Sequence, residues 1–114
     1  MQGCFTDKHE EIKNKILNSE TYITGVENAS RIFSMLGEPN RMKIILALME
    51  GELCVYHICE IVGGKQSAVS QHLRKLKDNH IVKSRKDGTQ VLYSIADEHI
   101  YSIVKSALEH THCF

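Results

Sequence analysis

A pair of glycines, Gly63 and Gly64, lies between two short segments with helical periodicity, and it constrains the fold more than any other feature. Residues 54–62 precede the pair, and residues 67–79 follow it with Val69, Leu73 and Leu76 on one side of a helix. Two successive glycines predict a tight turn, because glycine adopts backbone conformations that other residues avoid. The pattern therefore predicts a helix, a turn and a second helix.

A β-hairpin is predicted directly downstream, over residues 82–86 and 90–95, because Asp87-Gly88-Thr89 between them is typical of a hairpin turn. The other helices are expected over residues 9–18, 26–36, 40–50 and 97–110, with a polar break over residues 18–24. We therefore expect a mainly α chain with a small β-hairpin, a winged helix-turn-helix. The expected division is an N-terminal helix and arm over residues 1–24 and a winged helix-turn-helix domain over residues 25–114.

The composition is that of one globular domain, with 114 residues, 42% hydrophobic and 25% charged. A chain of this size buries only a modest core, which favours a dimer. No apolar run approaches the roughly 18–20 residues of a membrane span, and residues 1–20 lack the apolar core of a signal peptide. We expect a cytoplasmic protein without a membrane partner, and we interpret its four cysteines as thiols.

The formal net charge is zero, but positive charge is concentrated in one segment. Residues 74–87 hold six Lys and Arg residues against two Asp residues, a local charge of +4. A neutral chain with one basic segment is compatible with a DNA-binding face and acidic residues elsewhere.

The helix after the glycine pair is the candidate recognition helix. If Val69, Leu73 and Leu76 pack inward, small and amide side chains near its N-terminus face outward and can contact base edges, while basic residues further along hold phosphates. The hairpin would lie along the flanking backbone or minor groove as a wing. A solvated helix face is the alternative. The candidate DNA-binding residues are Gln66, Ser67, Ser70, Gln71, His72, Arg74 and Lys75 on the helix and Lys83, Arg85 and Lys86 on the hairpin.

The C-terminal helix contains candidate metal ligands on one stripe. His99 and His110 are eleven positions apart, so they fall about 20° from one another but about 16 Å apart along the axis. Two ligands at that distance cannot share an ion within one chain. In a two-fold antiparallel helix pair, Asp97 and His99 of one chain would meet His110 and Cys113 of the other, a ligand set that suits zinc.

Three points of this metal site stay open. Asp97 lies off the stripe and can serve only from the cap position, where a plain N-cap is its alternative role. His112 competes with Cys113 for the fourth position. A histidine-rich polar tail without metal is the alternative for the whole set.

A second metal site is possible at Cys54 and His57, with Cys4 from the N-terminal arm. Its alternative is two core cysteines (Cys54 and Cys59) beside an exposed histidine.

These residues together resemble the ArsR/SmtB family of small dimeric winged-helix repressors, over about residues 26–113. The segments that carry the resemblance are Leu36-Gly37-Glu38-Pro39-Asn40-Arg41, Gly51-Glu52-Leu53-Cys54-Val55, Ser67-Ala68-Val69-Ser70-Gln71-His72-Leu73 and Lys86-Asp87-Gly88. The resemblance implies a homodimer that represses its operator when metal-free and is released by a transition metal. The family's C-terminal metal site maps onto Asp97, His99, His110 and Cys113, and Cys54 and His57 match the second position.

Zinc is the expected effector, with cobalt, nickel and cadmium as alternatives. Tyr56 stands where arsenic- and cadmium-type members have the second Cys of Cys-Val-Cys, which argues against a three-thiolate arsenic site. The main alternative function is a thiol, redox or cadmium-type sensor of the same fold that uses Cys54 and Cys4. A metal-stabilised interaction module and a zinc hydrolase are weaker hypotheses, because the hydrolase would need a base and a cleft. We expect no enzymatic activity, no catalytic residues and no small-molecule substrate.

Overall fold

The computed structural model describes residues 7–112 of the chain. The elements in chain order are α1 (Asp7–Leu17), α2 (Glu20–Leu36), α3 (Pro39–Leu48), β1 (Leu53–Cys54), α4 (Val55–Val62), α5 (Gln66–Asp78), β2 (Val82–Asp87), β3 (Gln90–Ile95) and α6 (Glu98–His110). Two compact units divide the chain after Ser34, and the predicted division between residues 24 and 25 falls inside α2. Among the described helices, none has the length and apolarity needed to cross a membrane.

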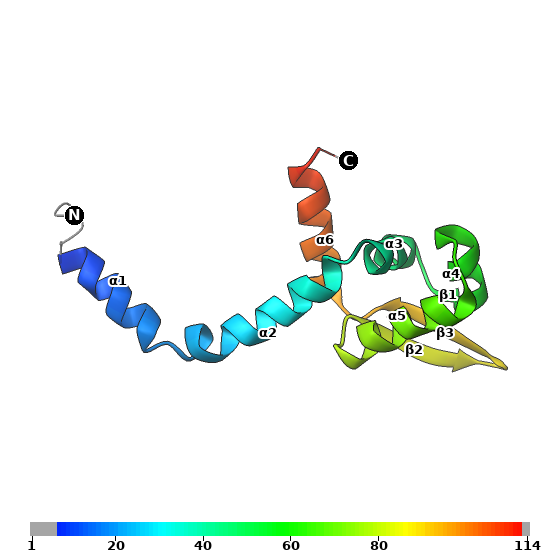
Figure 1. Ribbon diagram of the computed structural model, residues 1–114, viewed down its shortest axis with the longest axis horizontal. Coiled ribbons are helices and arrows are strands. Elements are labelled where there is room, and N and C mark those ends of the chain that lie inside the picture. The colour runs from blue at the N-terminus through cyan, green and yellow to red at the C-terminus, as the bar shows by residue number, and fades with distance from the viewer. Residues whose placement is uncertain (1–6, 113–114) are drawn as a thin grey trace. The chain divides into compact units, whose positions relative to one another are not determined.

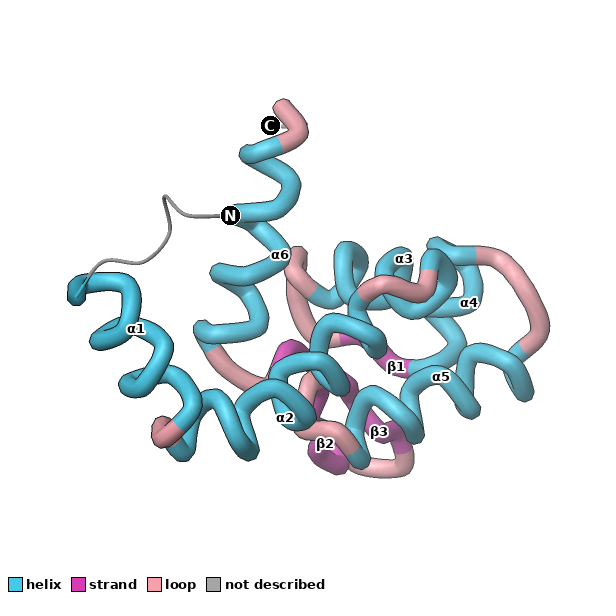
Figure 2. The backbone as a smooth tube through the Cα atoms, turned by 60° about the vertical axis from the view of Figure 1, so that its left-hand side comes forward, coloured by secondary structure: helices cyan, strands magenta, loops and turns pink. Residues whose placement is uncertain are grey.

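The second unit is the predicted winged helix-turn-helix (Figure 1). Helices α3, α4 and α5 lie together beside a small antiparallel sheet, in which β3 is the central strand between β1 and β2 (Figure 2). The β2–β3 hairpin pairs from Val82 with Ile95 to Asp87 with Gln90 and forms the wing. The most deeply buried side chains are Ile44, Ile45, Ile58, Leu73, Leu76, Ile81 and Val104.

Local sequence explains the start of α3 and the end of α5. Pro39 occupies the first turn of α3, and the Glu38 carboxylate accepts hydrogen bonds from the backbone N–H groups of Asn40 at 2.8 Å and Arg41 at 3.1 Å. Two residues after the end of α5, His80 has a left-handed backbone with φ of 60°, and the N–H of Ile81 donates to the Leu76 carbonyl. That reversal turns the chain from α5 into the wing.

The structure corrects two sequence predictions. Residues 18–24 do not form a long break, because α2 already begins at Glu20. Cys54 does not begin a helix but ends β1, a strand that pairs Leu53 with Tyr93 and Cys54 with Leu92. A two-residue strand is invisible to periodicity, since it is specified by partners about forty positions away in the chain.

The first unit consists of α1 and most of α2, and none of its described side chains is buried. Its large apolar side chains are instead exposed, with Ile16, Tyr22 and Val26 lining a shallow apolar groove where the two helices meet. Taken by itself, the described part of this unit therefore has a large exposed apolar surface.

Candidate functional site

Helix α5 has the two faces that its sequence predicts. Val69, Leu73 and Leu76 are at most 3% exposed, so they anchor one face of the helix in the core. The opposite face is solvent-exposed and holds Gln66, Ser67, Ser70, Gln71, Arg74 and Lys75. Lys65, the N-cap residue of α5, makes no side-chain hydrogen bond to the first N–H groups of the helix. Small polar groups at the helix start and cations further along form a surface suited to a polyanion.

His72 lies differently from the other candidate DNA-binding residues of α5. It is half-buried, and it lines a cavity of about 220 Å³ together with Asn40 of α3 and Gly64 of the turn. Its charge also contributes to the lowered pKa of the Glu38 carboxyl, although the hydrogen bond from the Asn40 N–H is the largest cause. His72 thus lies on the side of the recognition helix that faces the start of α3.

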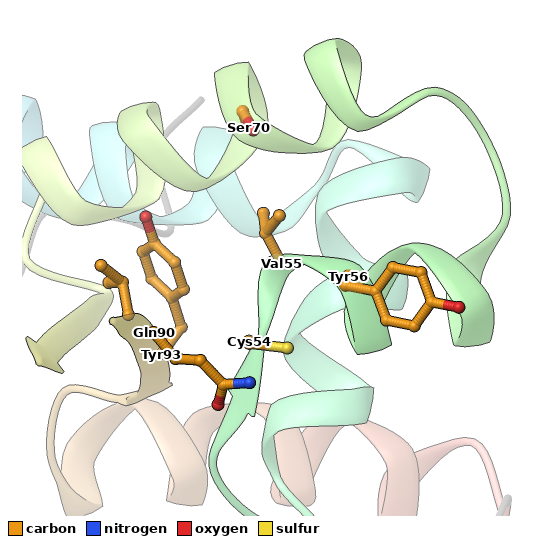
Figure 3. A pocket seen from close by; sticks show the side chains of 7 residues that line it. Cys54, Val55, Tyr56, Ser70, Gln90 and Tyr93 are labelled. Carbon is orange, nitrogen blue, oxygen red and sulfur yellow. The ribbon is translucent and has the colours of Figure 1, made fainter. Parts of the chain in front are cut away.

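The wing places its basic residues on two faces. Side chains alternate along a strand, so Lys83 and Arg85 share one face of β2, and Lys86 shares the other face with Ser84. Ser84 pairs in register with Tyr93, whose ring extends from β3 toward α5 (Figure 3). Lys86 is therefore on the side of the wing that faces the recognition helix.

Arg85 makes a contact that the sequence gives no signal for. Its Nε donates to Glu52 Oε2 at 2.8 Å, and its Nη2 donates to Glu52 Oε1 at 2.7 Å, a bidentate ion pair. These hydrogen bonds lower the pKa of Glu52 and raise the pKa of Arg85. The two residues are 33 positions apart, so only the folded sheet brings them together.

Helix α6 separates the candidate metal ligands into two groups. Asp97 is its N-cap, and Oδ1 of this side chain accepts from the N–H groups of His99 at 2.9 Å and Ile100 at 3.2 Å. Those N–H donors, Ile100 first, lower the pKa of the Asp97 carboxyl. His99 Nδ1 lies 3.5 Å from Asp97 Oδ1, and its side chain is 92% exposed. His110 is exposed in the last turn, about 16 Å further along the helix by its rise per residue.

No group of three or more Cys, His, Asp or Glu side chains with the geometry of a metal site occurs within the described part of a single chain. The Asp97–His99 pair brings two donors together, and His110 stays apart from it. Cys113, the fourth predicted ligand, and Cys4 lie outside the described residues. His112 is described, and its backbone is left-handed with φ of 63°.

A second pair of donors occurs at the start of α4. Cys54 Sγ and His57 Nδ1 are 3.2 Å apart, so the predicted spacing does bring them together. Cys54 is 8% exposed, His57 is exposed, and the His57 ring lies edge-on to Tyr56. Both described cysteines, Cys54 and Cys59, are free thiols.

The Cys54 end of this pair opens onto a hollow beside the recognition helix. The hollow, about 350 Å³, is lined by side chains from β1, α4, α5 and β3, including Cys54, Tyr56, Ser70 and Tyr93 (Figure 3). A chemical change at Cys54 would therefore occur next to the surface that includes Ser70.

Comparisons with known proteins place the chain among bacterial transcriptional regulators. Residues 38–84 match the sequence profile of the bacterial regulatory protein family arsR. The chain is 39% identical over 84 residues to a cadmium resistance transcriptional regulatory protein CadC homolog of Staphylococcus aureus, a match that covers 73% of this chain and 69% of that one. It is 34% identical to a transcriptional repressor SmtB homolog of Synechocystis, a match that covers 74% of this chain and 64% of that one.

Among solved structures, the chain is similar to the homodimeric winged helix-turn-helix DNA-binding domain Mb0332 of Mycobacterium bovis, described as a possible ArsR-family regulator. The TM-score is 0.71 with 26% identity, and the match covers 85% of this chain and 94% of that one. The first two relatives are named as transcriptional regulators, the class of protein that the sequence predicts.

Proposed function

Because this chain belongs to the ArsR/SmtB family of winged-helix transcriptional regulators, we propose that it is a metal-responsive repressor. It binds operator DNA as a metal-free homodimer, and a transition metal bound between the C-terminal helices releases it. The observation that carries the proposal is the separation of donors on α6, with Asp97 and His99 at one end and His110 at the other. Such a set becomes complete only when a second chain contributes.

DNA binding is supported by the exposed face of α5 and by the wing. Gln66, Ser67, Ser70 and Gln71 occupy the exposed first turns, the part of a recognition helix that contacts base edges. Arg74 and Lys75 follow on the same face and serve as phosphate contacts. A two-fold dimer places two such helices about one turn of DNA apart.

The homodimer is supported by the apolar side chains that are exposed on the described helices α1 and α2. Ile16, Leu17, Tyr22, Ile23 and Val26 are each at least 42% exposed on α1 and α2. Exposing this much apolar area costs free energy that a second copy recovers by burying it. The similar Mycobacterium bovis domain is described as homodimeric, which supports the same assembly here.

The donors of α6 suit zinc in a site shared by two chains. In an antiparallel pair of α6 helices, Asp97 and His99 of one chain lie beside His110 of the other, and Cys113 supplies the fourth ligand. Asp97 can cap the helix through Oδ1 and bind the metal ion through Oδ2. A cation bound by four ligands in tetrahedral geometry cross-links the two chains. Cobalt, nickel or cadmium can replace zinc in such a ligand set.

Regulation follows from the position of these ligands beside the wing. Asp97 comes two residues after β3, so a constraint on the start of α6 acts directly on the strand that forms the wing. Metal bound to the α6 ligands then holds the two protomers in a relative orientation that differs from the one DNA requires. Coupling is reciprocal: if zinc lowers operator affinity about 100-fold, operator lowers zinc affinity by the same factor, about 2.7 kcal/mol.

The proposal is tested by zinc titration of the reduced dimer bound to a fluorescent duplex from its own promoter, with release followed by anisotropy. His110→Ala should bind the duplex as tightly as the wild type and should not release it on zinc addition. His57→Ala is the matched control, since it removes an exposed histidine outside α6 and should leave zinc release intact. Normal zinc release by His110→Ala would contradict the assignment of the metal site to α6.

A second candidate function is supported by the 3.2 Å contact between Cys54 and His57. In this alternative, Cys54, His57 and Cys4 bind cadmium, or Cys54 acts as a thiol sensor, and the hollow beside Ser70 transmits the change to α5. The relative from Staphylococcus aureus carries cadmium resistance in its name. Cys54→Ser distinguishes the two functions: it abolishes the response in the alternative and preserves zinc release in the primary proposal.

A further inference from the structure

The ion pair between Glu52 and Arg85 crosses the central strand of the sheet. In register, Leu92 of β3 has Cys54 of β1 on one side and Arg85 of β2 on the other. Glu52 directly precedes β1, two positions before Cys54, and its carboxylate reaches over β3 to the Arg85 guanidinium. The pair therefore joins the two outer strands to each other, past the strand that lies between them.

At the β1 edge of the sheet, backbone pairing that could hold the orientation of the wing is short. Strand β1 contributes only two residues, so the pairing between the wing and the helix-turn-helix at this edge is confined to Leu53 with Tyr93 and Cys54 with Leu92. Two parallel hydrogen bonds between a guanidinium and a carboxylate fix the relative orientation of the two planar groups, which a single hydrogen bond does not. The pair adds a second connection between the wing and the segment that leads into α4.

We propose that Arg85 is a positioning residue of the wing and that Lys86, not Arg85, makes the wing's phosphate contact. The inference rests on the proposed DNA-binding function and assigns different roles to two adjacent cations. Both carboxylate oxygens of Glu52 accept hydrogen bonds from Arg85, so this guanidinium is engaged and its charge is balanced. Lys86 lies on the opposite face of β2, the face it shares with Ser84 and, through pairing, with Tyr93 near α5.

The proposal makes an unusual prediction about the sign of an effect. Removing an acidic side chain from a DNA-binding surface ordinarily strengthens binding, because it removes repulsion from phosphates. Here Glu52→Gln should weaken binding, because an amide offers one neutral acceptor oxygen in place of the two charged ones that hold Arg85 to the residue before β1. Arg85→Gln should weaken binding by a similar factor, and the reversed pair Glu52→Arg with Arg85→Glu should recover part of the loss.

The experiment measures operator affinity of the full-length, reduced, metal-free protein as a function of salt concentration. Glu52→Gln and Arg85→Gln should each weaken binding about two- to fivefold, the range typical of an exposed pair, with the salt dependence unchanged. Lys86→Gln is the matched variant, and it should reduce the slope of log K against log salt by about one, as the loss of a phosphate contact does. Tighter binding by Glu52→Gln, or a reduced slope in Arg85→Gln, would overturn the proposal.

Amide hydrogen exchange without DNA separates this inference from the DNA-binding function itself. Glu52→Gln should accelerate exchange of the Leu92 and Tyr93 amides relative to those of α5, which the pair does not touch. Unchanged exchange in the hairpin would refute the positioning role, whatever the DNA measurements show. Faster exchange in a protein that binds duplex DNA without steep salt dependence would leave the positioning role in place and refute the proposed function instead.

Discussion

Leu73 and Arg74 are neighbours on the recognition helix, and their substitution by alanine should separate folding from DNA binding. Leu73 is 1% exposed within the core formed around α5, whereas Arg74 is exposed on the opposite face. Leu73→Ala removes three buried carbon atoms and leaves a cavity that its neighbours fill only in part. The expected cost is about 3 kcal/mol of unfolding free energy, within the roughly 2–5 kcal/mol range of such substitutions.

Urea denaturation at one fixed protomer concentration measures this cost, since the apparent stability of a dimer depends on concentration. A domain of this size is stable by about 5–15 kcal/mol, so the variant should still fold. Arg74→Ala is the control on the other face: its stability should stay within about 0.5 kcal/mol of the wild type. Its operator affinity should fall, with a salt slope reduced by about 0.9. Equal destabilisation by the two variants would refute the assignment of faces on α5.

Three further predictions concern the ends of helices. Glu38 caps α3 and has a lowered pKa, so its contribution to stability is complete above its ordinary value of 4.5 and is lost as pH falls through the lower folded value. Glu38→Gln should therefore flatten the loss of thermal stability below about pH 5, as melting curves between pH 7 and pH 3 would show. His80→Gly should stabilise the chain by about 0.5–1 kcal/mol in urea, because glycine tolerates the left-handed backbone there, whereas His80→Ala should give no gain. Asp97→Asn should keep the α6 cap and thermal stability but lose the zinc response, and Asp97→Ala should lose both; a normal zinc response in Asp97→Asn would exclude this carboxylate as a ligand.

The sequence predicts the elements that carry their own periodicity or turn signal. The buried side of α5 follows from Val69, Leu73 and Leu76 at helical spacing, and the predicted bounds of that helix differ from the observed ones by one residue at each end. The wing follows from Asp87-Gly88, where the positive φ of 66° at Gly88 explains the glycine. The cap role of Asp97 also follows from its position before the last helix.

What the sequence misses depends on distant partners. The side chains in the first turns of α2 are not buried within the single chain, so packing inside the chain does not mark its start at Glu20. Strand β1 exists because Leu53 pairs with Tyr93, and the Glu52–Arg85 contact exists because β1 and β2 flank the same strand. The proposed metal ligands present a stronger form of this difficulty, because in the proposed site their partners belong to a second chain.

A mixed dimer tests the central claim, a metal site shared between two α6 helices, most directly. One protomer carries His99→Ala and the other carries His110→Ala, and two different affinity tags allow purification of the mixed species. If the sites are shared, one of the two metal sites in the mixed dimer combines the unaltered His110 of the first protomer with the unaltered His99 of the second and stays intact. We predict one tightly bound zinc per mixed dimer, and none at this site in either homodimeric variant. A mixed dimer that binds no more zinc than the homodimeric variants would contradict the account, because a site within a single chain is broken in both protomers.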